Sequence, residues 1–274
     1  MESWASPAKI NLFLHITGRR SDGYHELQTA FQFLDYSDTL SFDVTEQNDI
    51  KLITPIEGVA HDDNLIVRAA KMLQQHADIK KGVRISLDKK LPMGGGLGGG
   101  SSNAATTLVA LNSMWECQLS NEQLAKIGLE LGADVPVFIH GYAAWAEGVG
   151  EKLTEINPDE PWYVVIIPPC HVSTAKVFSY QELTRDSKSM TMSGFLSGEG
   201  RNVCENVVRK YFSPVADALD WLGLYANSRM TGTGACVFAG FEHQADAQRV
   251  INKLPDAWQG FIAKGCNQSP LYRN

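Results

Sequence analysis

The sequence predicts a mixed α/β protein, of the α+β type, built from two domains. Strand-like and helix-like segments alternate along its 274 residues, and a glycine-rich run at 94–100 lies between a strand pattern and a helix pattern. A polar stretch with two prolines at 157–161 separates two halves that each contain strands and helices. We therefore expect residues 1–156 to form one domain and residues 157–274 a second, with a cleft between them.

The first predicted strand covers residues 9–16, where side chains alternate between two faces. One face is entirely apolar, whereas the other begins with Lys9 and Asn11, which are unusually polar for a well-patterned strand. A turn over residues 18–25 follows. Further strands are expected at 30–36, 39–44 and 49–53.

Helix signals begin at Asn64, which is expected to cap a helix over 65–75. An alternating strand at 83–87 leads into the glycine run, and a buried helix is expected over 102–115.

A second helix should begin after Ser120, because Ser120 and Gln123 have the spacing of a capping box. Gly132 is well placed to end it. We expect Asp134 to lie in a turn that leaves this helix and enters a strand over 137–146.

The second half is expected to begin with a strand and to mix helices with strands until its end. Its predicted strands are 162–167, 235–240 and 258–264, and its predicted helices lie near 174–183, 202–212, 214–224 and 243–253.

Composition excludes several classes of protein. The net charge is 24 − 31 = −7 and no basic run is longer than a pair, so nucleic acid is not an expected partner. No apolar stretch approaches the ~20 residues of a membrane helix, and the first residues lack a secretory signal pattern. Five scattered cysteines without a C-x-x-C pair favour a reducing compartment. We expect a cytoplasmic protein without a membrane partner, either a monomer or a weak homodimer.

The glycine run is the strongest chemical signal. Six glycines in seven positions let a backbone fold closely around a ligand, and the following helix start would favour an anion such as a nucleotide phosphate tail. The run contains G-x-G-x-x-G without the acidic residue of a dinucleotide site, and Ser101 replaces the lysine of a P-loop. The expected phosphate-binding residues are Pro92, Met93, Gly94, Gly95, Gly96, Leu97, Gly98, Gly99, Gly100, Ser101 and Ser102.

A second glycine cluster, Thr231–Ala235, precedes a predicted strand. Alone it is more typical of a tight turn than of a binding site. One cluster in each half makes a shared cleft for two anionic groups more plausible.

Four segments, taken in order, resemble the GHMP kinases, the superfamily of galactokinase, homoserine kinase, mevalonate kinase and phosphomevalonate kinase. They are residues 7–12, 92–105, 131–136 and 231–235, and the resemblance runs from about residue 4 to about residue 272. Tyr24 and His25 after the first strand, with the Gly-Ala-Asp-Val-Pro turn, resemble one branch. That branch phosphorylates a cytidylyl-linked sugar alcohol of the non-mevalonate isoprenoid pathway.

The resemblance implies a two-domain kinase that uses ATP with Mg²⁺ on a small-molecule alcohol. From the residues alone, Asp134 is equally well a general base or a turn residue, and Lys9 is more simply a solvated strand lysine. The resemblance implies that Asp134 accepts the proton of the acceptor hydroxyl and that Lys9 lies beside it, stabilising charge on the transferring group.

The resemblance also implies that Tyr24 stacks on cytosine, that His25 bonds to the base edge and that Phe178 is the opposing ring. Asn64 would lie near the adenine. No carboxylate occurs between Gly94 and Glu116, so Mg²⁺ is expected on phosphates and water, with at most a Ser101 or Ser102 hydroxyl from the protein. The implied acceptor-binding residues are Asn11, Tyr24, His25, Thr174, Phe178, Gly232, Thr233 and Gly234.

Four alternatives stay open at this point. The first is a GHMP kinase that acts on another small alcohol, such as homoserine or mevalonate. The second is a dinucleotide-dependent oxidoreductase, suggested by the G-x-G-x-x-G pattern. The others are a non-catalytic relative, which has no chemical reason to keep both Lys9 and Asp134, and an RNA-binding module, which the acidic charge disfavours.

Overall fold

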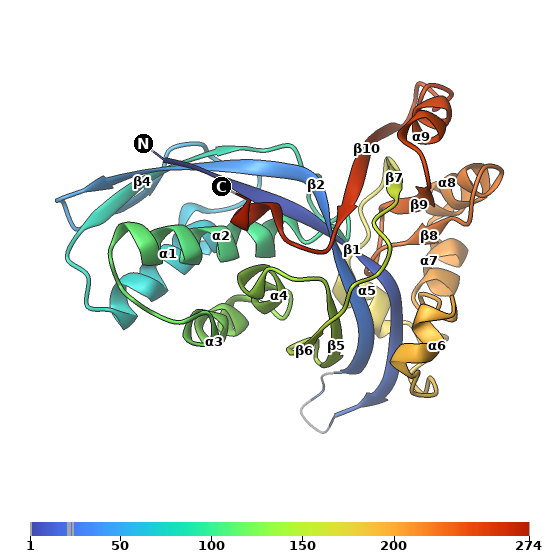
Figure 1. Cartoon of the computed structure of the whole chain (residues 1–274), viewed down its shortest axis with the longest axis horizontal. Helices are drawn as coiled ribbons and strands as arrows, with labels where there is room; N and C mark the ends of the chain where they lie inside the picture. Colours follow the sequence, from blue (N-terminus) through green and yellow to red (C-terminus); the bar gives the residue numbers. More distant parts are fainter. Residues whose placement is uncertain (1, 21–22, 24, 274) are drawn as a thin grey trace.

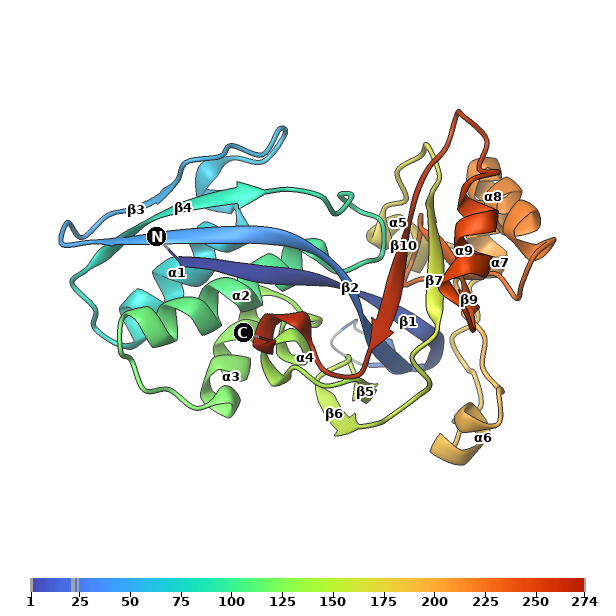
Figure 2. The ribbon, with the colours of Figure 1, turned by 45° about the horizontal axis from the view of Figure 1, so that its top comes forward.

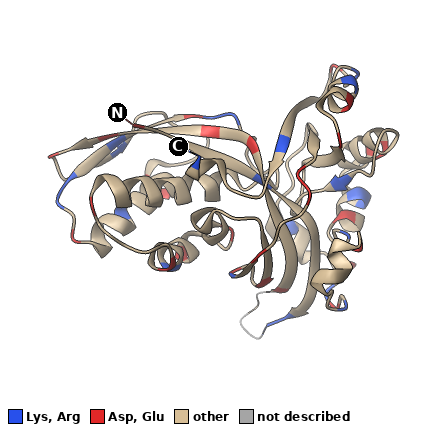
Figure 3. Cartoon of the chain, in the orientation of Figure 1, with Lys and Arg blue, Asp and Glu red and all other residues tan. Residues whose placement is uncertain are grey.

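The computed structural model describes residues 2–20, 23 and 25–273, and it has two lobes (Figure 1). In the first lobe, helices cover one face of a mostly antiparallel sheet, in which β3 alone pairs parallel among the described strands; in the second, helices flank a smaller sheet (Figures 1 and 2). Basic and acidic residues are interspersed along the ribbon of both lobes, without a long single-sign stretch among the described residues (Figure 3). Among the described helices, none has the length and apolar character needed to cross a membrane.

Two long strands run through both lobes. β1 (Glu2–Arg19) pairs antiparallel with β2 (His25–Thr45) along nearly its whole length. The predicted break between 30–36 and 39–44 is wrong, because β2 passes through its polar residues without ending. The register instead shifts between Pro7 and Lys9, so that a bulge absorbs the extra residues of β2.

The helices of the first lobe agree with their end signals. The Asn64 side chain accepts a hydrogen bond from the Ile66 N–H, and Ser120 and Gln123 form the predicted capping box. The remaining elements of this lobe are β3 (Ile50–Leu52), the 3₁₀ turn η1 (His61–Asp63), α1 (Leu65–His76), β4 (Gly82–Asp88), α2 (Gly99–Met114), α3 (Asn121–Leu131), α4 (Val135–His140), β5 (Ala144–Gly148) and β6 (Lys152–Glu155).

The predicted strand over 137–146 is partly wrong. Residues Val135–His140 form helix α4, and only Ala144–Gly148 is extended. Pro136 in the first helical turn and Gly141 with φ +75° just after the last turn are typical helix boundaries. The apolar run between them is buried on every side, so its periodicity could not separate a helix from a strand.

The second lobe keeps the predicted order of elements, with shorter helices. The predicted helix near 174–183 ends at Ser179, and a short helix at 192–196 and a two-residue strand were not predicted. Its elements are β7 (Trp162–Ile167), α5 (Thr174–Ser179), α6 (Met192–Leu196), α7 (Glu205–Tyr211), α8 (Ser213–Gly223), β8 (Arg229–Met230), β9 (Val237–Phe241), α9 (Gln244–Ile251) and β10 (Gln259–Cys266).

The two lobes share strands and a core. β10 pairs with β7 in the second lobe and then with β2 in the first, which joins the sheets in the order β3-β4-β2-β10-β7-β9-β8. A cluster between the lobes contains Ile10 from β1 together with Val165 from β7. After β10 the chain returns to the first lobe, where Ser269 N–H donates to the Gly141 carbonyl. The predicted division had assigned these last residues, including the turn η2 (Pro270–Tyr272), to the second domain.

Candidate active site

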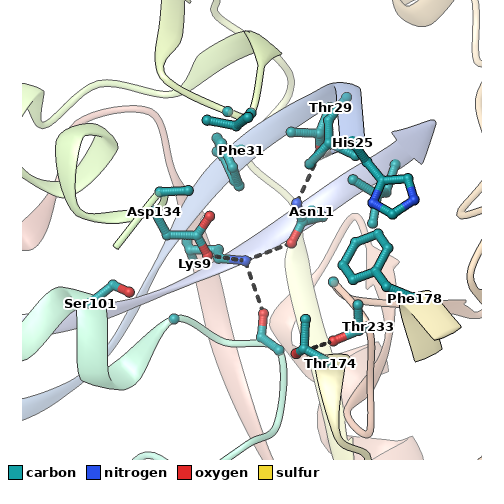
Figure 4. Close-up of a pocket in the computed structure, with 18 of the residues that line it drawn as sticks. Lys9, Asn11, His25, Thr29, Phe31, Ser101, Asp134, Thr174, Phe178 and Thr233 are labelled. Carbon is teal, nitrogen blue, oxygen red and sulfur yellow. Dashed lines mark hydrogen bonds and ion pairs between the residues drawn. The ribbon is translucent and has the colours of Figure 1, made fainter. Parts of the chain in front are cut away.

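A cavity of about 710 Å³ opens between the lobes (Figure 4). β1, β2 and the turn before α4 contribute residues from one side, and α5 and the second glycine cluster contribute residues from the other. The cavity therefore brings together residues far apart in the sequence, among them Lys9, Asn11, His25, Gly96, Ser101, Asp134, Thr174, Phe178, Gly232 and Thr233.

Lys9 is the buried cation of this cavity, with only 2% of its surface exposed. Its ammonium donates to Asn11 Oδ1 at 2.6 Å and to the Gly96 carbonyl at 3.1 Å, and it lies 3.2 Å from Asp134 Oδ2 (Figure 4). It also lies 5.2 Å from the centre of the Phe31 ring. Since an ammonium has three N–H donors, these three oxygens satisfy it completely. The arrangement holds a buried charge because every donor has a partner.

Asp134 stands at the N-cap position of α4, and its side chain makes no hydrogen bond to that helix. The carboxylate therefore serves the cavity instead of the helix end, which favours the general-base interpretation over the turn-residue interpretation. Its side chain is 35% exposed, and the helix start adds a favourable field for a negative charge. Lys9 contacts Oδ2, which leaves Oδ1 available to a ligand.

Thr231 connects the two glycine clusters beneath the cavity. Its hydroxyl accepts from the Asn11 N–H at 3.0 Å and donates to the Gly96 carbonyl at 3.1 Å, and the residue is fully buried. Asn11 in turn donates through its amide to the Thr29 hydroxyl at 2.9 Å. The residues of one lobe are thus positioned by a side chain from the other.

The glycine run wraps around a second cavity of about 340 Å³. Gly96 has φ +78°, and a Cβ there would lie 2.3 Å from the Thr231 carbonyl oxygen. Gly98 has φ +72° at the N-cap of α2, where a Cβ would lie 2.9 Å from Phe138. Glycine is therefore required at both positions. Of the predicted phosphate-binding residues, those lining this second cavity are Pro92, Met93, Gly94, Gly95, Leu97, Gly98, Gly99, Gly100 and Ser101, together with Asn64.

Three predicted residues lie elsewhere. Gly96 lines the larger cavity instead of the second one. Ser102 lines neither, because it is fully buried and accepts a hydrogen bond from Ser6 at 2.9 Å. Gly234 also lines neither, although its neighbour Thr233 does and exchanges a hydrogen bond with Thr174 at 2.8 Å.

Sequence reasoning missed Lys89, which lines the second cavity. Its ammonium lies 2.7 Å from the fully buried carboxylate of Asp38. Asp38 also accepts the backbone N–H groups of Lys90 and Leu91 and the amide of Asn103. Nothing in the local sequence indicates this contact, because β2 and the loop before α2 meet only in the fold.

At the far end of the larger cavity, His25 and Phe178 are stacked, with ring centres 4.9 Å apart and planes at 21°. Burial lowers the pKa of His25 below its usual 6.5, and the charges of Arg185 and Arg19 lower it further. The imidazole is therefore neutral at pH 7. The predicted partner Tyr24 lies outside the described residues.

Within residues 2–20, 23 and 25–273, no three histidine, cysteine, aspartate or glutamate side chains lie close enough to hold a metal ion. The Ser101 hydroxyl lines both cavities, whereas the Asp134 carboxylate lines the larger one. Hydroxyl and carboxylate oxygens suit Mg²⁺, which usually takes few protein ligands when it accompanies a nucleotide.

Comparisons with known proteins agree with this geometry. Two family models match the chain, the GHMP kinases N terminal domain over residues 64–142 and the GHMP kinases C terminal over residues 187–260. The 4-diphosphocytidyl-2-C-methyl-D-erythritol kinase of Nitrosococcus oceani is 58% identical over 268 residues, which are 98% of this chain and 96% of the relative. The protein of that name from Shewanella baltica is 59% identical over 270 residues, 98% of this chain and 95% of the relative.

The chain belongs to the GHMP kinases. A crystal structure of 4-(cytidine 5'-diphospho)-2C-methyl-D-erythritol kinase superposes on this GHMP kinase with a TM-score of 0.85 and 30% identity, covering 96% of this chain and 99% of the other. A mevalonate kinase structure at 16% identity and a TM-score of 0.72, covering 98% of this chain and all of the other, shares the fold. The predicted two-domain GHMP kinase fold is confirmed, and family membership removes the oxidoreductase and RNA-binding alternatives.

Proposed function

We propose that this GHMP kinase transfers the γ-phosphoryl group of ATP to the 2-hydroxyl of 4-diphosphocytidyl-2-C-methyl-D-erythritol, a reaction of the non-mevalonate isoprenoid pathway. The names of relatives at 58% and 59% identity support this acceptor. The observation that carries the proposal is that one cavity holds the Lys9–Asp134 pair and the His25–Phe178 pair. The first pair suits phosphoryl transfer, and the second suits a planar base.

In this reaction the acceptor oxygen attacks the γ-phosphorus, the bond from that phosphorus to the β,γ-bridging oxygen breaks, and ADP leaves. Asp134 accepts the hydroxyl proton through Oδ1, while Lys9 holds Oδ2 and so orients the carboxylate. The glycine run and the start of α2 hold the phosphates of ATP in the second cavity. Gly98 and Ser101 line both cavities, so the γ-phosphate would lie where they meet.

Mg²⁺ would accompany ATP and reduce the negative charge of its phosphates. Ser101 is the hydroxyl that fits it, because Ser102 is buried and already accepts a bond from Ser6. We place the reaction in the cytoplasm, supported by five free cysteines.

The deciding experiment offers ATP and Mg²⁺ with one acceptor at a time: 4-diphosphocytidyl-2-C-methyl-D-erythritol, mevalonate or homoserine. ADP release is measured, and ³¹P NMR locates the new phosphate ester. We expect turnover with the cytidylyl acceptor and a phosphomonoester on its 2-oxygen. Preferential turnover of mevalonate or homoserine would refute the proposed acceptor while leaving a GHMP kinase in place.

A further inference from the structure

Arg185 lies in the segment that follows α5 and uses all of its N–H groups on that segment and on His25. Nη2 donates to the Phe178 carbonyl at 2.8 Å and to the Tyr180 carbonyl at 2.7 Å. Nη1 donates to the Leu183 carbonyl at 3.0 Å and to the Gln181 carbonyl at 3.5 Å. Nε donates to His25 Nε2 at 3.3 Å.

These contacts position both members of the aromatic pair. The carbonyls of Phe178 and Tyr180 lie at the C-terminal end of α5, where a positive charge is favourable. The same guanidinium therefore fixes the backbone that carries the Phe178 ring and the imidazole stacked against it.

The contact with His25 also fixes where its proton resides. An arginine Nε–H can only donate, so His25 Nε2 must accept, and the neutral imidazole must carry its proton on Nδ1. Among the described residues, none forms a hydrogen bond with His25 Nδ1. Because His25 lines the cavity, this nitrogen can contact a ligand there. The group that His25 offers to a ligand is therefore an N–H donor.

We propose that Arg185 is a positioning residue that makes His25 a hydrogen-bond donor to N3 of the substrate's cytosine and thereby selects cytosine over uracil. Cytosine N3 is an acceptor, whereas uracil carries a proton at N3 and would face a second donor. A buried donor without an acceptor costs about 1–3 kcal/mol, which corresponds to roughly 5- to 150-fold in affinity. This inference rests on the proposed function, because it takes the cavity to bind the base of a cytidylyl substrate.

The first test observes the proton directly, without turnover. Two-dimensional ¹H–¹⁵N NMR spectra of the imidazole nitrogens are recorded on the whole protein at pH 7. The His25 signals are those that disappear in the His25→Asn variant. We expect the Nδ1–H form in the wild type and a loss of that preference in Arg185→Met. A wild-type His25 that carries its proton on Nε2, or on both nitrogens, overturns the proposal.

The second test measures base selection by isothermal titration with cytidine 5′-diphosphate and uridine 5′-diphosphate, after a non-hydrolysable ATP analogue has filled the second cavity. We expect the wild type to prefer cytidine by at least about tenfold and Arg185→Met to lose most of that preference. Arg249→Met is the matched control, because Arg249 is an exposed arginine on α9 that pairs with Asp246. Equal preferences in the wild type and Arg185→Met refute the role of Arg185.

Arg185→Lys keeps a charge at the end of α5 and is the variant to use if Arg185→Met does not fold. A lysine cannot hold four carbonyls and an imidazole together, so we expect an intermediate loss of preference. In His25→Asn the amide donates without help, so adding Arg185→Met should leave its base preference unchanged. If Arg185 acts only on the backbone of α5, the added substitution lowers the preference there too, and the proposal fails.

The proposed reaction and the proposed role of Arg185 can be refuted independently of each other. Tautomer and base preference are measured on the resting protein, so they stand or fall without catalysis. A protein that prefers cytidine but does not phosphorylate the cytidylyl acceptor would refute the proposed reaction alone. A protein that phosphorylates it with an unaltered base preference in Arg185→Met would refute the role of Arg185 alone.

Discussion

Replacing Asp134 with asparagine keeps the shape of the side chain and removes its ability to accept a proton. General-base catalysis contributes about 10²–10⁴ in rate, so we expect kcat to fall by that factor, equivalent to about 2.7–5.4 kcal/mol of barrier. The structure argues against a large loss of stability. Asparagine is a good N-cap residue, the Asp134 side chain makes no capping bond, and the asparagine oxygen can still accept a hydrogen bond from the Lys9 ammonium. We expect the free energy of unfolding to fall by about 1–3 kcal/mol, because the buried Lys9 ammonium keeps an oxygen partner but loses its counter-charge.

The assay follows ADP release at saturating ATP and acceptor, with urea unfolding of the same preparations. Asp220→Asn is the matched control and should keep full activity, because Asp220 on α8 forms an exposed ion pair with Arg209 of α7. The KM for ATP should stay within about twofold of the wild type, since the second cavity does not include Asp134. A kcat within threefold of the wild type, or a loss of activity explained by unfolding, would refute the general-base role.

Three further predictions concern the surroundings of the site. Thr231→Val removes the acceptor of the buried Asn11 N–H, so urea unfolding should show a loss of about 1–3 kcal/mol; an unchanged unfolding curve would contradict the link between the glycine clusters. Gly96→Ala adds a Cβ 2.3 Å from a carbonyl oxygen at φ +78°, whereas Gly58→Ala adds one in open space at φ +77°. The positive φ should lower the free energy of unfolding of both variants by about 1–2 kcal/mol. The clash should lower that of Gly96→Ala by about 1–3 kcal/mol more and remove most of its activity. Equal free energies of unfolding in the two variants would argue against the clash. Burial and a nearby arginine hold the pKa of His15 below 6.5, so the unfolded chain binds more protons below that pH. Stability should therefore fall as pH falls below about 6.5, by at most about 1.4 kcal/mol per pH unit for this one group, and His15→Gln should reduce that slope in urea titrations at several pH values.

The parts of the fold and site that the sequence predicted correctly carry local signals. Alternation along residues 9–16 placed Lys9 and Asn11 on one face of a strand, and the structure confirms that they share a cavity. The capping box at Ser120 and Gln123 is confirmed. It could be predicted because both of its hydrogen bonds join residues only three positions apart. The glycine run follows β4 as predicted, although α2 already begins at Gly99 inside the run, and most of the run lines one cavity.

The parts that it did not predict depend on contacts between distant segments. Helix α4 was taken for a strand because an apolar run buried on all sides has no diagnostic period, even though Pro136 and Gly141 mark its ends. Lys89 and Arg185 act on groups 51 and 160 residues away in the chain, and no local pattern reports such pairs. The roles of the individual site residues stay predictions until the variants are measured.

The strand pair β1–β2 limits how this enzyme could be recombined with other kinases. Side chains of β1 contribute to three packed clusters or their borders: Trp4 borders that of the first lobe, Ile10 belongs to the one between the lobes and Leu14 to that of the second. A chimera joined at residue 156 would unite a foreign second lobe with the native Leu14 and Ile16 that must pack inside it. Exchanging the acceptor-binding half therefore requires exchanging the end of β1 and the start of β2 as well. For protein engineering, the exchangeable unit is the lobe together with its part of the shared strands.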